Sequence, residues 1–177
     1  MVGAVHLPGD GRPGRERNIC IIGVGNEHRR DDGVGIWVAR QIAAARWDGA
    51  TVVASNAGDS VALLSAWKGA KVAYLIDAVC AEIEPGAIIR LDSQRHPSMG
   101  HLRSLSSHGL GIVEAIELGR ALEMLPERLI IYGIAGRSFE HGEGLSPEVE
   151  RAARKVIGRL HRVTMRGRLR ICTSDPL

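Results

Sequence analysis

Four side chains in this sequence are of the types that bind metals or move protons. Asp31 and Asp32 are adjacent carboxylates that follow an apolar run and a short charged loop. Asp77 closes the most apolar stretch of the chain, and His108 stands where a Ser-rich loop enters a helical pattern. Two carboxylates and an imidazole suit a hard-to-borderline divalent metal that keeps open coordination positions. The residue types therefore indicate metal-assisted chemistry, with either aspartate of the pair as a candidate acid or base.

Each of these residues also has a purely structural interpretation. Asp31 or Asp32 could cap the helix that follows, because a helix N-terminus favours carboxylates. Asp77 could cap the turn after its strand, and His108 could cap its own helix. A helix N-terminus disfavours the imidazolium, so we expect His108 to be neutral near pH 7. The spacing forms no local metal motif such as His-Glu-x-x-His.

Two rival chemistries fit the residues less well. Gly23-Val24-Gly25 begins like a dinucleotide-binding fingerprint, but His28 stands where the third glycine belongs and Glu27 would repel a pyrophosphate. Cys80 could pair with His108 as a nucleophile, but no glycine-rich elbow flanks it. We therefore expect Cys80 to be a small buried thiol.

Hydrophobic periodicity predicts the elements that carry these residues. Strands are expected at residues 18–23, 51–54, 71–78, 87–91 and 128–134, and helices at 33–46, 60–68, 109–122 and 147–162. Ser60 and Ser146 are the expected N-caps of two helices, and residues 92–107 read as a surface loop. The alternation predicts an α/β sandwich of three layers, a mostly parallel sheet flanked by helices. Ligands of such sheets lie beyond the carboxyl ends of the strands.

Composition defines the domain and its surroundings. Residues 18–163 are expected to form a single domain, with a flexible tail at 1–17 and a basic tail at 164–177. After Glu150 the chain has eight lysines and arginines against one acid, which leaves residues 1–150 with a net charge of −4. Without interleaved aromatics this basic end predicts a solvated helix face, and we expect no nucleic-acid partner. Three unpaired cysteines and the lack of a long apolar run predict a cytoplasmic protein with no membrane insertion.

Four motifs in order resemble the hydrogenase maturation proteases. They are Gly23-Val24-Gly25-Asn26, Asp31-Asp32-Gly33-Val34-Gly35, Ile76-Asp77-Ala78 and Ser107-His108-Gly109-Leu110-Gly111. The segments Gly133-Ile134 and Gly144-Leu145-Ser146-Pro147-Glu148-Val149 also resemble the ending of that family, so that the likeness spans residues 18–163. The family often has Glu where this chain has Asp32, and an acidic residue or Gln where it has Ala135, with Arg137 nearby.

The resemblance implies a twisted sheet of about five strands and an endopeptidase activity. It implies that Asp32, Asp77 and His108 contact nickel already inserted in the [NiFe]-hydrogenase large-subunit precursor, whose C-terminal extension is then removed. The nickel would be supplied by the substrate, with no organic cofactor. Asp31 is a candidate general base, as is a carboxylate of the trio. A non-catalytic hydrogenase assembly factor and a self-contained zinc peptidase are the alternatives.

Overall fold

The computed structural model describes residues 5–6, 19–47, 50–56, 59–95 and 108–171, although the side chains of the last helical turns are not among them. Its sheet has the order β1-β3-β2-β4-β6-β5. Four strands, β3 (Ala50–Asn56), β2 (Ile19–Gly25), β4 (Val72–Val79) and β6 (Arg128–Ala135), are parallel. The edge strands β1 (Val5–His6) and β5 (Ile88–Asp92) run antiparallel to them. The predicted five-stranded, mostly parallel sheet is confirmed, with β1 as an added two-residue edge.

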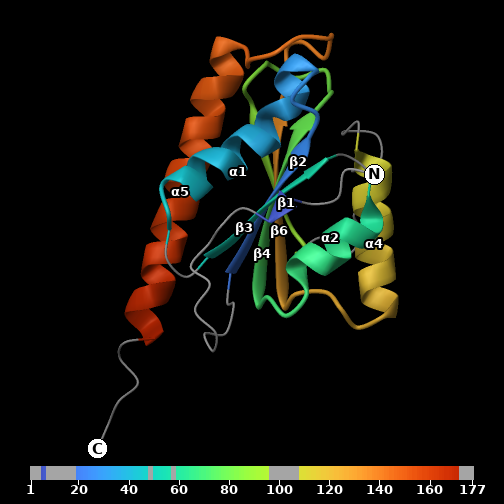
Figure 1. Ribbon diagram of the computed structural model, residues 1–177, viewed down its shortest axis with the longest axis vertical. Helices are drawn as coiled ribbons and strands as arrows, with labels where there is room; N and C mark the ends of the chain where they lie inside the picture. The colour runs from blue at the N-terminus through green and yellow to red at the C-terminus, as the bar shows by residue number, and fades with distance from the viewer. Residues whose placement is uncertain (1–4, 7–18, 48–49, 57–58, 96–107, 172–177) are drawn as a thin grey trace, which may run out of the picture.

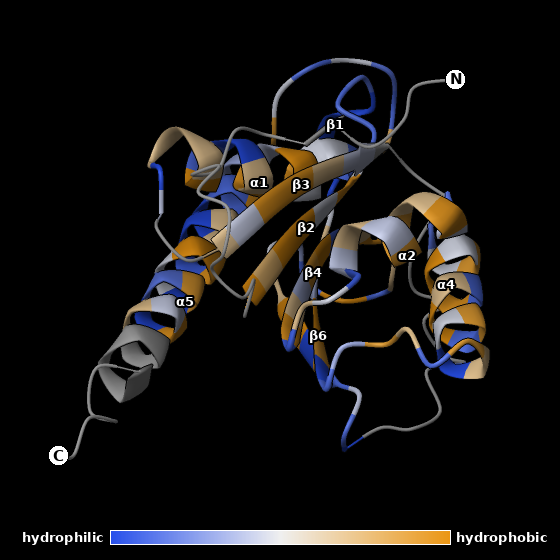
Figure 2. Cartoon of the chain, turned by 60° about the horizontal axis from the view of Figure 1, so that its bottom comes forward, coloured by the Kyte–Doolittle hydropathy of each residue, from blue (hydrophilic) through white to orange (hydrophobic). Residues whose placement is uncertain are grey.

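Two pairs of helices cover the sheet (Figure 1). The pair α1 (Val34–Ala44) and α5 (Pro147–Ile171) packs on one face, and α2 (Ser60–Trp67) with α4 (Gly109–Ala121) packs on the other. Alternate residues of the buried strands serve the two faces: Ile22 and Leu75 lie in the α2/α4 core, Ile21 and Ile76 in the α1/α5 core. Figure 2 shows these strands as a hydrophobic layer between the helices. The three layers predicted from sequence are present.

Close backbone approach explains the glycines of the first motif. A Cβ placed on Gly23 would lie 2.0 Å from the carbonyl oxygen of Gly35, and one on Gly35 would lie 2.3 Å from that of Ile76. Such distances are far below van der Waals contact, so helix α1 packs directly on β2 and β4 only because both positions lack a side chain. The two glycine motifs therefore fix how the loop between β2 and α1 sits over the sheet.

Several element ends differ from the sequence prediction. A 3-10 turn, η1 (Arg30–Gly33), precedes α1, so Asp31 and Asp32 lie in that turn. The cap of α2 is Asp59, whose carboxylate accepts from the Ala62 amide at 2.9 Å, and the predicted cap Ser60 is wrong because it already begins the helix. Helix α5 continues to Ile171, well into the stretch predicted to be a tail, and β1 falls inside the predicted N-terminal tail. Residues 96–107 of the predicted loop lie outside the described residues.

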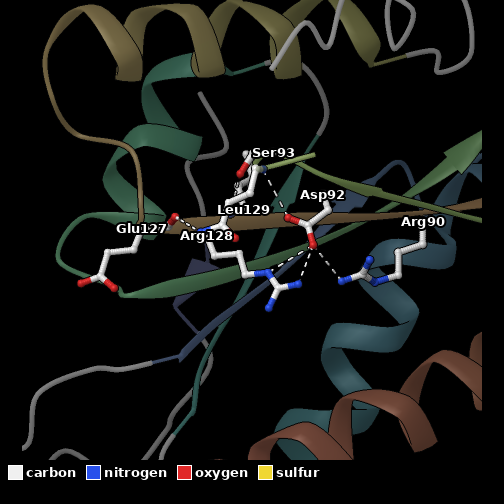
Figure 3. A network of polar contacts seen from close by, with 7 residues as sticks. Arg90, Asp92, Ser93, Glu127, Arg128 and Leu129 are labelled. Atoms are coloured by element: carbon white, nitrogen blue, oxygen red, sulfur yellow. Dashed lines mark hydrogen bonds and ion pairs between the residues drawn. The ribbon is translucent and has the colours of Figure 1, made fainter. Parts of the chain in front are cut away.

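A further buried aspartate, Asp92, lies at the opposite end of the parallel strands from the predicted site. Asp92 ends β5, where the start of β6 brings Arg128 beside it (Figure 3). Its Oδ2 accepts from Arg128 Nη2 at 2.6 Å, from Arg128 Nε at 3.2 Å and from Arg90 Nη2 at 3.2 Å. Mainly because of the Arg128 hydrogen bonds, the pKa of Asp92 is lowered to about 2. This ion-pair network ties the edge strand β5 to β6.

Candidate active site: a buried carboxylate–imidazole trio

The sheet topology brings three of the predicted site residues to one place. Strand order reverses between β2 and β4, since the chain moves from β2 to β3 on one side and later to β4 on the other. Such a switch point is where α/β sheets bind ligands. Asp32 follows β2, Asp77 lies near the carboxyl end of β4, and His108 stands at the N-terminus of α4. The predicted convergence of the trio is therefore present.

The imidazole of His108 lies between the two carboxylates. Its Nδ1 is 3.0 Å from Asp77 Oδ1, a hydrogen bond in which the ring N–H donates to the carboxylate. Its Nε2 is 3.6 Å from Asp32 Oδ2, an ion-pair distance that is too long for a hydrogen bond. Asp77 Oδ1 also accepts from the amide of Ala78 at 2.9 Å. The bond to Asp77 fixes the tautomer and orientation of the ring, so that Nε2 faces Asp32.

The structural interpretations of these residues are mostly excluded. His108 occupies the N-cap position of α4, but its side chain makes no capping hydrogen bond. Neither η1 nor α1 has a side-chain cap, so Asp31 and Asp32 do not act as N-caps. Asp77 does bind the next amide, which is a local role alongside its contact with His108.

The pKa of His108 is shifted in the opposite direction to the one expected from its place at a helix N-terminus. Burial is the largest single influence and lowers the pKa of the imidazole. The hydrogen bond to Asp77 and the charges of Asp77 and Asp32 together outweigh it and raise the pKa above its ordinary 6.5. The expected downward shift is wrong, because the two carboxylates beside the ring stabilise its charged form.

The trio is more buried than expected for a site with an open position. Asp32 is 0% exposed, Asp77 2% and His108 8%. No group of three His, Cys, Asp or Glu side chains in the described part of the chain is arranged to hold a metal ion. The imidazole is the member of the trio that reaches the surface. An incoming group therefore meets His108 first.

Asp31 has a different set of partners from its neighbour. Its Oδ2 accepts from the amides of Arg137 and Ser138 at 2.8 and 3.0 Å and from Ser146 Oγ at 2.8 Å, and its Oδ1 accepts from the Ser146 amide at 2.6 Å. The side chain is fully buried. This carboxylate fastens the loop 136–146, between β6 and α5, to the turn that carries Asp32. Sequence reasoning missed the contact because its partners are more than 100 residues away and Ser146 was interpreted only as a helix cap.

Two further sequence expectations concern residues around the site. Cys80 is exposed, so the expectation of a buried thiol is wrong; it lies just past the end of β4, where the chain leaves the core. Arg137 pairs with Glu148 of α5 while its amide binds Asp31. The Arg137 side chain, which lies near the point where the sequence departs from the family pattern, thus helps to attach the loop to α5.

Comparison with known proteins identifies related sequences and folds. The sequence model of one family, described as hydrogenase maturation protease, matches residues 43–163. This range includes Asp77 and His108 and begins after Asp32. A search among curated proteins gives no match.

Solved structures show the same fold. The hydrogenase maturating endopeptidase HybD from E. coli superposes with a TM-score of 0.73 at 21% identity, covering 85% of this chain and 93% of the other. The [NiFe] hydrogenase maturation protease HybD from Thermococcus kodakarensis gives 0.69 at 22% identity, covering 83% and 99%. A second protein of that organism, the [NiFe] hydrogenase maturation protease HycI, gives 0.64 at 21% identity, covering 84% and 93%.

Proposed function

Because this chain belongs to the hydrogenase maturation protease family and is a hydrolase of the endopeptidase type, we propose that it removes the C-terminal extension of a [NiFe]-hydrogenase large-subunit precursor after nickel insertion. The observation that carries the proposal is the convergence of Asp32, Asp77 and His108 at the switch point of the sheet. The nickel belongs to the substrate, and the protease supplies no organic cofactor.

In this proposal the trio recognises the metal of the precursor. His108, the most exposed of the three, makes the first contact, and the Asp32 carboxylate facing its Nε2 supplies a second donor. Asp77 orients the ring through Nδ1, as carboxylates commonly do for metal-binding histidines. Local movement of these buried side chains accompanies the contact, and a precursor without nickel offers no such contact.

Nickel near the scissile peptide would polarise the carbonyl or activate a water molecule. Asp31 is a poor candidate for the base that takes the proton, because both of its oxygens already accept hydrogen bonds from the loop 136–146. We assign to Asp31 a positioning role and leave the base to a carboxylate of the trio. Neither Cys20 nor Cys80 forms a disulfide within the described residues, which supports a reducing, cytoplasmic setting. No described helix combines the length and apolar character that crossing a membrane requires.

The direct test mixes the purified protein with nickel-loaded and nickel-free precursor and follows the mass of the large subunit. Cleavage of the loaded precursor alone is expected. Equal processing of both would reject metal sensing, and binding without cleavage would favour a non-catalytic assembly factor. Stoichiometric zinc in the purified protein, with activity lost on its removal, would instead favour a self-contained zinc peptidase.

A further inference from the structure

A recess of about 530 Å³ opens on the α1/α5 side of the trio. We call it the Trp37 recess; its lining includes Arg30, Gly33, Trp37, Arg40, Glu143 and Leu145. The volume is within the usual range for ligand sites. None of the trio lines it, so it is a separate feature of the surface.

The Trp37 recess lies directly beside the residues of the site along the chain. Arg30 and Gly33, the two ends of turn η1, line the recess, while Asp32 inside the same turn faces His108. One short turn therefore presents a carboxylate to the trio and its own ends to the recess. The recess and the trio thus share turn η1.

The walls of the recess are held in place by backbone hydrogen bonds. Arg30 N donates to the Gly142 carbonyl at 2.9 Å, and Gly142 N donates to the His28 carbonyl at 2.9 Å. Arg29 Nε donates to the Phe139 carbonyl at 3.1 Å, and the Asp31 carboxylate fastens the same loop from inside. A recess already assembled before binding avoids the cost of ordering its walls.

The chemistry of the lining is that of a protein-binding surface. The half-buried Trp37 and Leu145 supply apolar surface, although the Arg154 guanidinium lies over the Trp37 ring at 5.5 Å from its centroid, and side chains of both charges surround them. Tryptophan and arginine within a polar rim are typical of the residues that dominate protein interfaces. A small-molecule site would enclose its ligand more completely. The open, charged rim favours a polypeptide.

The two arginines of the recess differ in their partners. Arg40 is paired with Glu27. The exposed guanidinium of Arg30 makes no hydrogen bond or ion pair to any residue that the structure describes. A planar guanidinium recognises carboxylates through paired hydrogen bonds. Arg30 is thus available for an acidic group of the bound polypeptide.

We propose that the Trp37 recess binds the precursor polypeptide next to the scissile bond, with an apolar side chain against Trp37 and Leu145 and a carboxylate against Arg30. This inference rests on the proposed function for the identity of the polypeptide. The carboxylate belongs to an acidic side chain or to the C-terminus of the extension. Both sources present the same chemistry to Arg30.

Photo-crosslinking locates the bound segment without depending on cleavage. A photoreactive residue at Gln41, which lines the recess, is expected to crosslink the C-terminal segment of the nickel-loaded precursor, whereas one at the exposed Glu114 of α4, which does not line the recess, is not. Mass spectrometry identifies the attached peptide. A crosslink from Gln41 to any other part of the precursor, or none, overturns the inference.

Kinetics supply the second test. Arg30→Glu is expected to raise KM for the loaded precursor by roughly tenfold with kcat little changed, because only a binding contact is reversed. Arg46→Glu is the matched control, since Arg46 is exposed, shares the positive φ of 48° and lies at the other end of α1. An unchanged KM in Arg30→Glu would reject binding of the precursor in the Trp37 recess and would leave the proposed protease function intact. Absence of cleavage by the native protein would reject that function and leave the crosslink to decide the recess.

The source of the carboxylate is decided with synthetic peptides of the extension. Peptides with a free and an amidated C-terminus compete for the Gln41 crosslink. Weaker competition by the amidated peptide assigns Arg30 to the terminal carboxylate. Equal competition assigns it to a side chain, and no competition by either peptide counts against the recess.

Discussion

Two buried aspartates at opposite ends of the parallel strands are bound by chemically different partners. Asp92, at the amino edge of the parallel strands, is bound by two guanidinium groups, and Asp77, at the carboxyl edge, is bound by an imidazole. A guanidinium stays protonated at every pH at which the protein is folded, so the Asp92 network is a fixed cross-link. An imidazole exchanges its proton near neutrality, so the Asp77 contact can take part in chemistry. Burial alone does not separate a structural acid from a functional one; the partner does.

The largest expected effect is on cleavage, and it follows from a substitution of Asp77. Asp77→Asn keeps an oxygen that can accept from His108 but removes the charge that orients the ring. Cleavage of the loaded precursor should fall by roughly 10–100-fold, the range for loss of a carboxylate that orients a metal-binding histidine. The free energy of unfolding in urea should change by less than about 1 kcal/mol. Glu114→Gln, an exposed charge change on α4, is the control, and equal losses of activity in both variants would contradict the assignment.

A substitution of Asp92 should have the opposite result, a loss of stability with little change in cleavage. Asp92→Asn leaves two guanidinium groups without their shared carboxylate. We expect a loss of about 2 kcal/mol in the free energy of unfolding, moderated because both arginines are partly exposed. Cleavage below the melting temperature should remain near the native rate. A large loss of activity with unchanged stability would show that the two edges are not independent.

Acid titration sharpens the same contrast. Because the folded pKa of Asp92 is about 2 and its ordinary value is 3.8, its stabilising contribution is complete above both values and is lost as the pH falls through them. About half of that contribution should be gone at pH 3. Urea unfolding of the native protein and of Asp92→Asn at pH 6 and pH 3 measures it. The difference between the two proteins should shrink at the lower pH, and a constant difference would contradict the ion-pair origin.

The smallest effect concerns Asp31, a third buried acid whose partners are neutral. Ser146→Ala removes the hydroxyl that donates to Oδ2 and leaves three backbone donors in place. Stability should fall by about 1 kcal/mol. Cleavage should slow by only a few-fold, through the loop and not through a lost base. A hundredfold loss of activity, measured with the same precursor assay, would instead favour direct chemistry at Asp31.

The fold and the positions of the site residues were predictable from the sequence because both depend on short-range patterns. Alternating apolar runs predict the strands and helices, and the known behaviour of parallel sheets places Asp31, Asp32, Asp77 and His108 at the carboxyl ends of the strands. The family resemblance then selects Asp32, Asp77 and His108 as the trio. The partners of Asp31 were not predictable, since no local spacing connects residue 31 with residue 146. The pKa of His108 was predicted in the wrong direction because the helix dipole is visible in a sequence, whereas the distance to two carboxylates is not.

The predicted end of one helix and the predicted cap of another were wrong for similar reasons. Helix α5 runs past its predicted end, and Thr164, which lies beyond that end, is still buried. Asp59 and Ser60 are both good capping residues, and only backbone geometry decides that Asp59 takes the role.

The position of β6 has a consequence for synthesis of the protein on the ribosome. Although β6 is made after β5, it lies between β4 and β5, and the serine that satisfies Asp31 comes later still. A nascent chain that has emerged only as far as β5 exposes one edge of β4, and its Asp31 carboxylate lacks its donors. The sheet and the hydrogen bonds that hold the turn carrying Asp32 are therefore complete only after residue 146 has left the exit tunnel.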